Sequence, residues 1–341
     1  MITAFQAFVK GKNNCFLFKK ALISSWDSGR ICGGGKKIMD YFPNIIGQPI
    51  AKERLSMYVD AHLNGYPLPN IMFVGPGGVG KTHIARQLAK GLNRSLVEIK
   101  GTAIKSKKQI IEQALIPIQG KEVTIFFDEA GEVDTDITNM FLPILEKQQS
   151  RRTDFTAPDG TVLTFDFHIQ NFIFGTTDAH KLSRPLRTRL NEVCLEDYTD
   201  SELIQILKLN TTKVNLEDEA LEELVKYSRG DGRWAFSMAE GIEIFLCSKG
   251  EQVFRKDHVP QFNRINGIYA EGLTLDEVKL LKVLRDYPIS VTAKILQGRM
   301  KLNLKALQDL ERYPESKGLM QIDSKRKLTN LGQEYLKRIG V

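Results

Sequence analysis

Cysteine and histidine are scarce in this 341-residue chain, and neither is clustered. The four cysteines lie far apart with no C-x-x-C pair, which excludes a disulfide framework and a zinc knuckle and favours a reducing cytoplasm. The five histidines show no metal-ligand spacing. No stretch approaches the roughly 18 consecutive apolar residues of a membrane span, so we expect no membrane partner. The length predicts two or three domains.

Positive charge is concentrated at the two ends of the chain, which carries +7 overall. Residues 1–38 hold seven Lys or Arg and one acid, residues 272–341 hold fourteen against eight, and the part between is acidic. A basic C-terminal module is typical of nucleic-acid binding, but a solvated surface can have the same composition. Charge alone leaves both interpretations open.

The first 38 residues have no clear amphipathic period and contain the run Gly33-Gly34-Gly35. Three interpretations are open: a disordered basic arm, an organelle-targeting peptide, or a purine-rich ribosome-binding site translated ahead of a true start at Met39. We favour the third, in which this basic extension is not native. A peptide from upstream of Met39 in the native protein would contradict it.

The most informative motif is the run from Gly75 to Thr82, which matches G-x-x-x-x-G-K-[ST] without a gap. An apolar run precedes it and a segment of helical periodicity follows, which is the strand–loop–helix context that a phosphate loop requires. Lys81 is expected to bind the β- and γ-phosphates, and Thr82 to hold Mg²⁺. The glycines let backbone N–H groups point at the phosphates. They are Gly75, Gly77, Gly78 and Gly80.

A second apolar run begins at Val123 and ends in two acids, Asp128 and Glu129. An acid at the carboxyl end of a buried strand holds the Mg²⁺ shell, and the next carboxylate polarises the attacking water. Both motifs together predict hydrolysis of the nucleotide rather than binding alone. The continuous apolar runs alternate with helical segments, which predicts a parallel sheet covered on both faces.

A hairpin is predicted between residues 148 and 168, because Asp159-Gly160 separates two alternating segments. Leu163, Phe165 and Phe167 fall on one face of it at period two. Either that face packs on the domain core, or it projects and binds a partner.

Hydroxyl and basic residues follow the third apolar run, which ends in Thr176 and Thr177. These hydroxyls suit contact with a γ-phosphate, and the arginines of residues 184–189 suit contact with a nucleotide on a neighbouring subunit. A solvated face is the alternative for the arginines. Lysines before the next predicted helix either line a DNA-binding pore or form an ordinary turn. They are Lys105, Lys107 and Lys108.

The last third of the chain is predicted to be helical, with a hairpin near its end. Helices are expected over residues 200–209, 217–227 and 233–246 and, after a linker, over 275–284, 291–296 and 303–310. Strands around a basic turn then predict a winged helix-turn-helix, with Asn303–Arg312 as recognition helix. Winged helices also bind proteins, so that alternative stays open. The cations expected on DNA phosphates are Lys301, Lys305, Lys325, Arg326 and Lys327.

In this order the motifs resemble the RuvB family, AAA+ ATPases that drive branch migration of Holliday junctions. The resemblance runs from about Tyr41 to Lys337. It rests on Ile46-Gly47-Gln48, residues 75–82, Gly101-Thr-Ala-Ile104, Phe127-Asp-Glu129, Gly175-Thr-Thr177, residues 185–189, residues 229–233 and the winged helix. It implies an α/β AAA+ P-loop core over residues 39–197, a helical lid over 198–264 and a winged-helix domain over 272–341.

The resemblance also implies a cytoplasmic homohexameric ring that uses ATP and Mg²⁺ on double-stranded or four-way-junction DNA, together with a RuvA-like junction-binding partner. By position, Thr177 resembles sensor 1, with Thr176 as the fallback. Arg189 resembles the arginine finger that acts on a neighbouring subunit, and Arg233 resembles sensor 2.

The resemblance assigns roles to four further residues. Ile46 and Gln48 fall where the family encloses the adenine, and Leu163 and Phe165 where its hairpin meets RuvA. The chain departs from the family in three places. The family's Arg-Pro ahead of the Ile-Gly-Gln stretch is absent here. The family's Asp-Glu-Ile-His-Arg is Asp128-Glu-Ala-Gly-Glu132 here, and its Gly-Thr-Pro-Arg is Gly230-Asp-Gly-Arg233.

Two other functions fit the same motifs. A nucleotide-gated loader would assemble on ATP and place a replication protein on DNA, and processive translocation under ATP turnover would distinguish a motor from it. A protein remodeller is disfavoured by the lysines at the predicted pore and by the basic winged helix.

Overall fold

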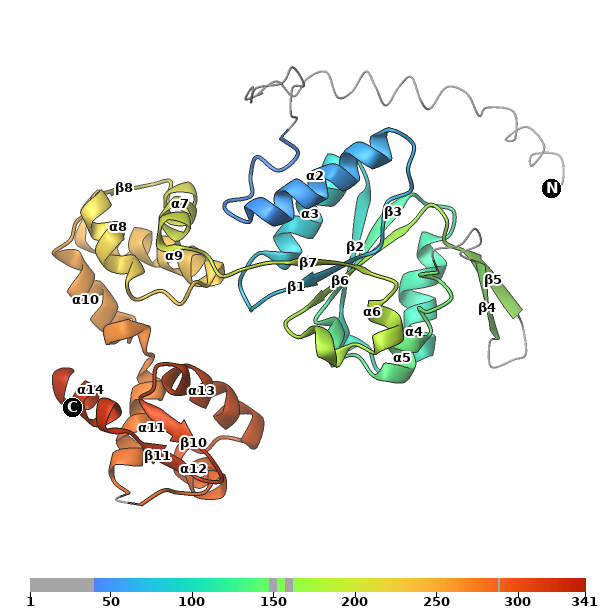
Figure 1. The fold of residues 1–341 in the computed structure, drawn as a ribbon. Helices are drawn as coiled ribbons and strands as arrows, with labels where there is room; N and C mark the ends of the chain where they lie inside the picture. Colours follow the sequence, from blue (N-terminus) through green and yellow to red (C-terminus); the bar gives the residue numbers. More distant parts are fainter. Residues whose placement is uncertain (1–39, 147–151, 157–161, 288) are drawn as a thin grey trace, which may run out of the picture.

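The computed structural model describes residues 40–146, 152–156, 162–287 and 289–341. The interpretations of residues 1–38 and of the Asp159-Gly160 turn therefore fall outside the described residues. Figure 1 shows three parts in succession: a sheet domain, a small helical domain and a C-terminal module that contains a short hairpin.

Five parallel strands form the central sheet, in the order β2-β3-β6-β1-β7. They are β1 (Ile71–Val74), β2 (Ser95–Lys100), β3 (Val123–Asp128), β6 (Asn171–Thr176) and β7 (Asn191–Cys194). The three middle strands are almost wholly buried, because helices cover both faces. The predicted parallel sheet and α/β AAA+ core are confirmed.

Each face of the sheet has its own core. On one face α2 (Pro49–Leu63) and α3 (Lys81–Gly91) pack around Phe73 and Leu88. The other face carries stacked and edge-on rings of Phe127, Phe141 and Phe174. It is covered by α4 (Lys107–Ile110), which continues as a π-helical turn, by α5 (Thr135–Asn139) and by α6 (Arg184–Arg187).

The predicted hairpin consists of β4 (Arg152–Thr156) and β5 (Val162–Asp166). Phe165 is 3% exposed and its ring stacks on that of Phe167, which is fully buried in the core. The prediction that Phe165 contacts a partner is therefore corrected: its ring packs in the core of the sheet domain. The side chain of Leu163 lies outside the described residues.

The helical domain corresponds to the predicted lid and has a separate core. Its helices are α7 (Asp200–Asn210), α8 (Asp218–Val225), α9 (Gly232–Lys249) and α10 (His258–Ile265), joined by the short pair β8 (Asn215–Leu216) and β9 (Val253–Phe254). A capping box between Thr199 and Glu202 fixes the start of α7.

The C-terminal module has the element order of a winged helix. It comprises α11 (Leu275–Arg285), α12 (Ala293–Met300), α13 (Leu304–Ser316), β10 (Met320–Ile322), β11 (Arg326–Leu328) and α14 (Asn330–Arg338). The helix predicted from Val291 begins two residues later, because Val291 exchanges two backbone hydrogen bonds of 2.8 Å with Arg326. Within the described parts of the chain, no helix has the length and apolar character to cross a membrane.

Candidate nucleotide site

A cavity of about 1100 Å³ lies where the carboxyl ends of the sheet strands meet the lid. Open α/β sheets bind ligands at this edge. One residue of α13 in the C-terminal module, Lys305, also reaches the wall. The cavity brings together these predicted site residues: Ile46, Gly77, Gly78, Gly80, Lys81, Thr82, Asp128, Glu129, Thr176, Thr177 and Arg233.

The phosphate loop has the backbone that the motif predicts. Gly78 and Gly80 adopt left-handed conformations, with φ of 82° and 91°. The Lys81 ammonium donates hydrogen bonds to the carbonyls of Gly75 at 2.8 Å and Pro76 at 2.7 Å. Gly75 acts there through its carbonyl and does not line the cavity. Burial lowers the pKa of Lys81, which is what a desolvated cation in a phosphate cradle would show.

Thr82 and Asp128 form a donor set that fits Mg²⁺. The Thr82 hydroxyl donates to Asp128 Oδ2 at 3.0 Å, and Asp128 Oδ1 accepts from the Glu129 N–H at 3.0 Å. A hydroxyl and an oriented carboxylate are the hard oxygen ligands that Mg²⁺ prefers. Glu129 itself has a left-handed backbone, with φ of 54°, and its exposed side chain lies at the cavity wall. A strained backbone of this kind is common at functional sites.

The two candidate sensor threonines differ in their contacts. The Thr176 side chain is buried, and its hydroxyl is bonded to the backbone of Asp178 at 2.9 and 3.1 Å. Thr177 is exposed at the cavity wall. A ligand in the cavity would therefore reach the Thr177 hydroxyl more readily.

The lid lies directly on the phosphate loop. The Gly232 N–H at the start of α9 donates to the Gly78 carbonyl at 3.2 Å. A Cβ atom on Gly78 would overlap the carboxylate of Asp231, and one on Gly77 would collide with the guanidinium of Arg233. Gly78, with its positive φ and the Asp231 carboxylate beside it, cannot be replaced without strain, whereas at Gly77 the exposed end of Arg233 can move aside.

An apolar wall was missed by the sequence reasoning. Ile206 and Leu209 of α7 and Phe236 of α9 line the cavity together with Ile46. Their surfaces suit the base of a nucleotide, since small-molecule sites are lined mainly by apolar side chains. Leu209 and Phe236 are exposed and lie off the buried faces of their helices. Apolar residues outside the buried face of a helix were the sequence signal that could have revealed this wall.

Comparisons with known proteins agree with this geometry. The family model described as the Holliday junction DNA helicase RuvB P-loop domain matches residues 38–195. Mycoplasmopsis pulmonis RuvB, a Holliday junction branch migration complex subunit, is 26% identical over 306 residues, which cover 87% of this chain and 96% of the relative. Its counterpart in Thermotoga petrophila is 27% identical over 265 residues, 75% of this chain and 78% of the relative. The chain resembles RuvB proteins over most of its length, and its sheet domain matches their P-loop domain.

A solved structure, the Thermotoga maritima RuvB Holliday junction branch migration motor, has the same fold. It aligns with a TM-score of 0.70 and 24% identity over 86% of this chain and 95% of its own. The alignment includes the lid and the C-terminal module of the RuvB-like chain, because it extends well beyond the sheet domain.

Two further residues predicted at the nucleotide site, Gln48 and Arg189, lie outside the cavity of the RuvB-like chain. Gln48 is 7% exposed, and its amide exchanges hydrogen bonds of 2.7 and 3.1 Å with the backbone of Glu196. The predicted contact of Gln48 with adenine is therefore corrected. The Gln48 side chain instead holds the backbone of Glu196, just after the last strand of the sheet. Arg189 pairs with Glu146 at 2.8 Å, so within its own chain it does not reach the cavity.

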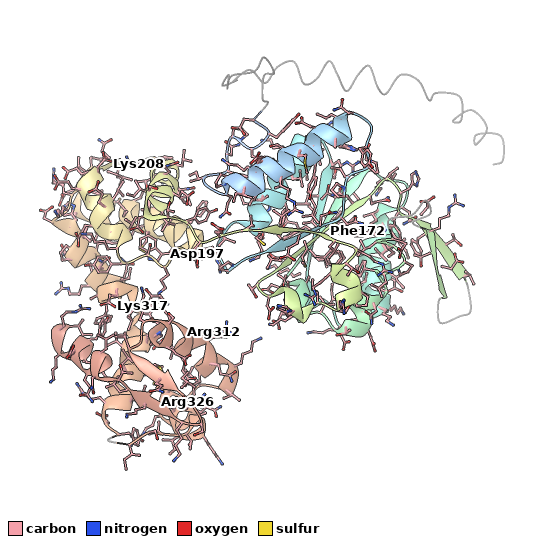
Figure 2. The ribbon with its side chains drawn as sticks, in the orientation of Figure 1. Phe172, Asp197, Lys208, Arg312, Lys317 and Arg326 are labelled. Carbon is pink, nitrogen blue, oxygen red and sulfur yellow. The ribbon has the colours of Figure 1, made fainter. Side chains whose placement is uncertain are left out.

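Two of the cations predicted to bind DNA have protein partners. Arg326, which Figure 2 labels in the C-terminal module, forms a bidentate pair with Glu311 at 2.9 and 3.1 Å. The two side chains are 12% and 1% exposed. Lys305 lies 3.7 Å from Glu132, at the rim of the cavity. Arg326 is therefore corrected to a structural cation, whereas Lys305, whose side chain is 78% exposed, stays a predicted DNA contact that lies at the cavity rim. The other predicted cations are exposed: Lys105, Lys107, Lys108, Lys301, Lys325 and Lys327.

The rim of the cavity shows one difference from the RuvB family that the chain resembles. Glu132 accepts a hydrogen bond from Lys181 at 2.6 Å and lies near Lys305. The hydrogen bond from Lys181 lowers the pKa of Glu132. An ionised carboxylate therefore occupies the motif position at which the family has arginine.

Proposed function

We propose that this RuvB-like chain is an ATP-hydrolysing ring motor that moves double-stranded DNA and drives branch migration of Holliday junctions in recombination and repair. Relatives that bear this name match almost the full chain. One observation carries the proposal: a single cavity joins the phosphate loop, the two Walker acids and an arginine of the lid.

The proposed roles follow from the contacts at the cavity. Bound Mg²⁺–ATP supplies the phosphoanhydride bond that is cleaved. Lys81 binds the β- and γ-phosphates, and Thr82 with Asp128 holds the metal ion. Glu129 orients the attacking water and accepts its proton. The apolar wall around Phe236 encloses the base.

Coupling to movement requires neighbouring subunits. In a hexameric ring, Arg189 of one subunit would contact the γ-phosphate held by the next, while Thr177 and Arg233 contact it from their own chain. Loss of the γ-phosphate removes these contacts and releases the lid to rotate against the sheet domain. A RuvA-like partner would hold the junction, and the work would take place in the cytoplasm.

A synthetic four-way junction tests this proposal. We expect the protein, with ATP and a RuvA-type partner, to convert the junction into duplex products and to hydrolyse ATP faster with the junction than without DNA. Lys81→Ala should abolish both activities. Lys90→Ala, an exposed lysine at the other end of α3, should leave them unchanged.

Two outcomes would reject the motor. An ATPase rate indifferent to every DNA would contradict DNA-driven turnover. A single ATP turnover that requires a second protein would instead identify a loader.

A further inference from the structure

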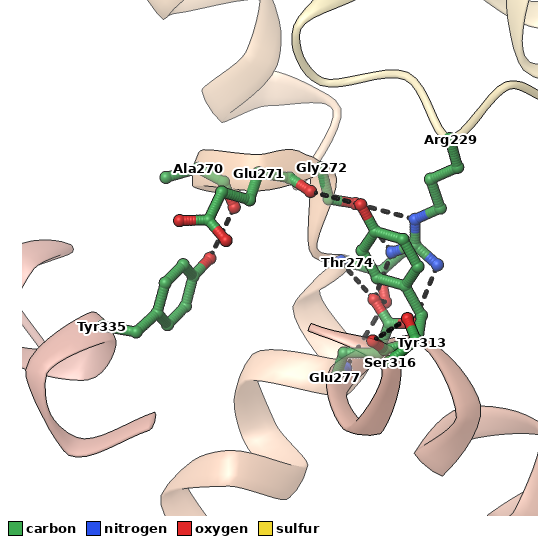
Figure 3. Close-up of polar contacts among 9 residues, drawn as sticks. All are labelled: Arg229, Ala270, Glu271, Gly272, Thr274, Glu277, Tyr313, Ser316 and Tyr335. Carbon is green, nitrogen blue, oxygen red and sulfur yellow. Dashed lines mark hydrogen bonds and ion pairs between the residues drawn. The ribbon is translucent and has the colours of Figure 1, made fainter. Parts of the chain in front are cut away.

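One short loop of the lid contacts both the phosphate loop and the C-terminal module. It runs from Arg229 to Arg233, ahead of and into α9. At its far end Arg233 lines the nucleotide cavity and Gly232 is hydrogen-bonded to Gly78. At its near end the Arg229 side chain points toward Glu277 of α11 and Tyr313 of α13 in the winged helix (Figure 3).

The Arg229 guanidinium is fully engaged there. It donates to the Gly272 carbonyl at 3.1 and 2.6 Å and to Glu277 Oε1 at 2.9 Å, with a second ion pair to Glu277 Oε2. Its Cζ atom lies 3.7 Å from the centre of the Tyr313 ring. The side chains of Arg229 and Glu277 are 27% and 5% exposed, so this is a largely desolvated, bidentate contact of the kind that lysine cannot reproduce.

The residues that receive Arg229 belong to two helices of the winged helix. Glu277 also accepts from the Thr274 N–H at 2.8 Å, closing the capping box that starts α11. Tyr313 belongs to α13, the candidate recognition helix, and its hydroxyl donates to the Glu271 carbonyl at 2.7 Å. One lid side chain thus contacts α11 and α13 together.

The lid and the winged helix are also joined by the chain segment of residues 266–274, which hydrogen bonds from Tyr313 and Tyr335 hold to the winged helix. Three residues of that segment have left-handed backbones: Gly267, Glu271 and Gly272, with φ of 64°, 58° and 76°. Hinges are formed by a few loop residues that absorb changes in φ and ψ. Arg229 spans this segment, since it bonds the Gly272 carbonyl from the lid side.

We propose that Arg229 is a positioning residue that couples the nucleotide site to the winged helix, so that nucleotide and DNA each change the affinity for the other. The inference rests on the proposed function, because it requires DNA at the winged helix. Two sites influence each other only through an element whose position both ligands bias. The loop of residues 229–233 is that element, because its ends contact both sites.

The first test measures the dissociation constant of a fluorescent duplex DNA with and without a non-hydrolysable ATP analogue. We expect the analogue to change the affinity of the unaltered protein about 5- to 150-fold. Arg229→Met should reduce that change to about twofold or less while DNA-independent ATPase activity is kept. Arg229→Lys should also fail to couple, because it lacks the planar fork. The control is Arg255→Met, an exposed arginine of the lid that pairs with Glu251.

The second test does not require DNA. Hydrogen exchange over residues 268–278 is measured with and without the analogue. Exchange should slow with the analogue in the unaltered protein but not in Arg229→Met. Tyr313→Leu keeps the ion pair between Arg229 and Glu277, so the slowing of exchange by the analogue should be only partly lost. This variant replaces Arg229→Met in the test if Arg229→Met does not fold. If the unaltered protein bound no DNA, the proposed function would be rejected. The hydrogen-exchange measurement would still test whether Arg229 couples the nucleotide site to the winged helix. An equal response of Arg229→Met and the unaltered protein would overturn the inference.

Discussion

The nucleotide site and the winged-helix surface were both predicted from charged and polar residues, but in the structure the predicted residues of the two regions have different contacts. At the nucleotide site, the Thr82 hydroxyl donates a hydrogen bond to Asp128, and Lys81 donates one to the Gly75 carbonyl of the phosphate loop. On the winged helix, Arg326 is bonded to Glu311 and Lys305 faces Glu132. Lys81 thus lines the cavity that would hold its ligand, whereas Arg326 and Lys305 each pair with an acid of their own chain.

The difference has a physical cause. A phosphate loop works through backbone geometry, which its glycines and the following helix fix locally. A cation on a surface is less available to a ligand where an acid of the same chain pairs with it, most of all where the pair is buried. Glu311 and Glu132 are such acids, and they come from positions that the local sequence around the cations does not reveal.

Arg189 offers the strongest way to break this comparison, because it too is paired within its own chain. If it acts on the neighbouring subunit, Arg189→Ala should lower the turnover number about 10³- to 10⁵-fold, since a trans arginine stabilises the transition-state charge. Steady-state ATPase assays measure this. Rings mixed from Arg189→Ala and Lys81→Ala subunits should regain activity at shared interfaces. Unchanged turnover in Arg189→Ala would show that its bond to Glu146 is its whole role.

Glu129 sharpens the comparison within the cavity. Glu129→Gln should lower turnover about 10²- to 10⁴-fold, because the amide cannot accept the proton of the attacking water. Nucleotide binding, measured by calorimetry, should persist. Glu132→Gln at the rim serves as the matched control and should have a much smaller effect on turnover. Equal losses in the two variants would contradict the assignment of the base.

Arg326 and Lys327 test the same point on the wing, as neighbours of opposite burial. Arg326→Met should lower the free energy of unfolding by about 3 kcal/mol, because it leaves Glu311 buried without its partner. Lys327→Met, at an exposed position, should change it by about 0.5 kcal/mol or less. Denaturant melts of both variants give the comparison, and similar stabilities would refute the structural role of Arg326.

The smallest expected effect is that of the exposed wing lysines on DNA binding. Replacing Lys325 and Lys327 together by alanine should reduce the slope of log affinity against log salt by about 2, because each phosphate contact contributes about 0.9. Duplex binding across a salt series measures the slope. If the slope does not change, the wing does not contact phosphates.

The sequence predicted the elements that local pattern determines. The phosphate loop, the sheet strands β1, β3 and β6 and the candidate recognition-helix segment were found because their apolar periods and glycine spacing are encoded within a few residues. The edge strand β7 was not predicted, because its four residues carry no such pattern. The burial of Phe165, the bond from Gln48 to Glu196 and the Arg326–Glu311 pair were not, because each depends on a partner brought close only by the fold. The apolar wall with Leu209 and Phe236 was missed because isolated apolar residues on a helix surface are common.

The bond between Arg326 and Glu311 also has an entropic consequence. Glu311 lies in α13 and Arg326 in β11, so the pair fastens the wing to the candidate recognition helix before any ligand arrives. A segment that is already ordered loses little conformational freedom on binding. Contacts made by the neighbouring lysines would then contribute to affinity almost undiminished, and the wing would meet the DNA as part of a rigid template.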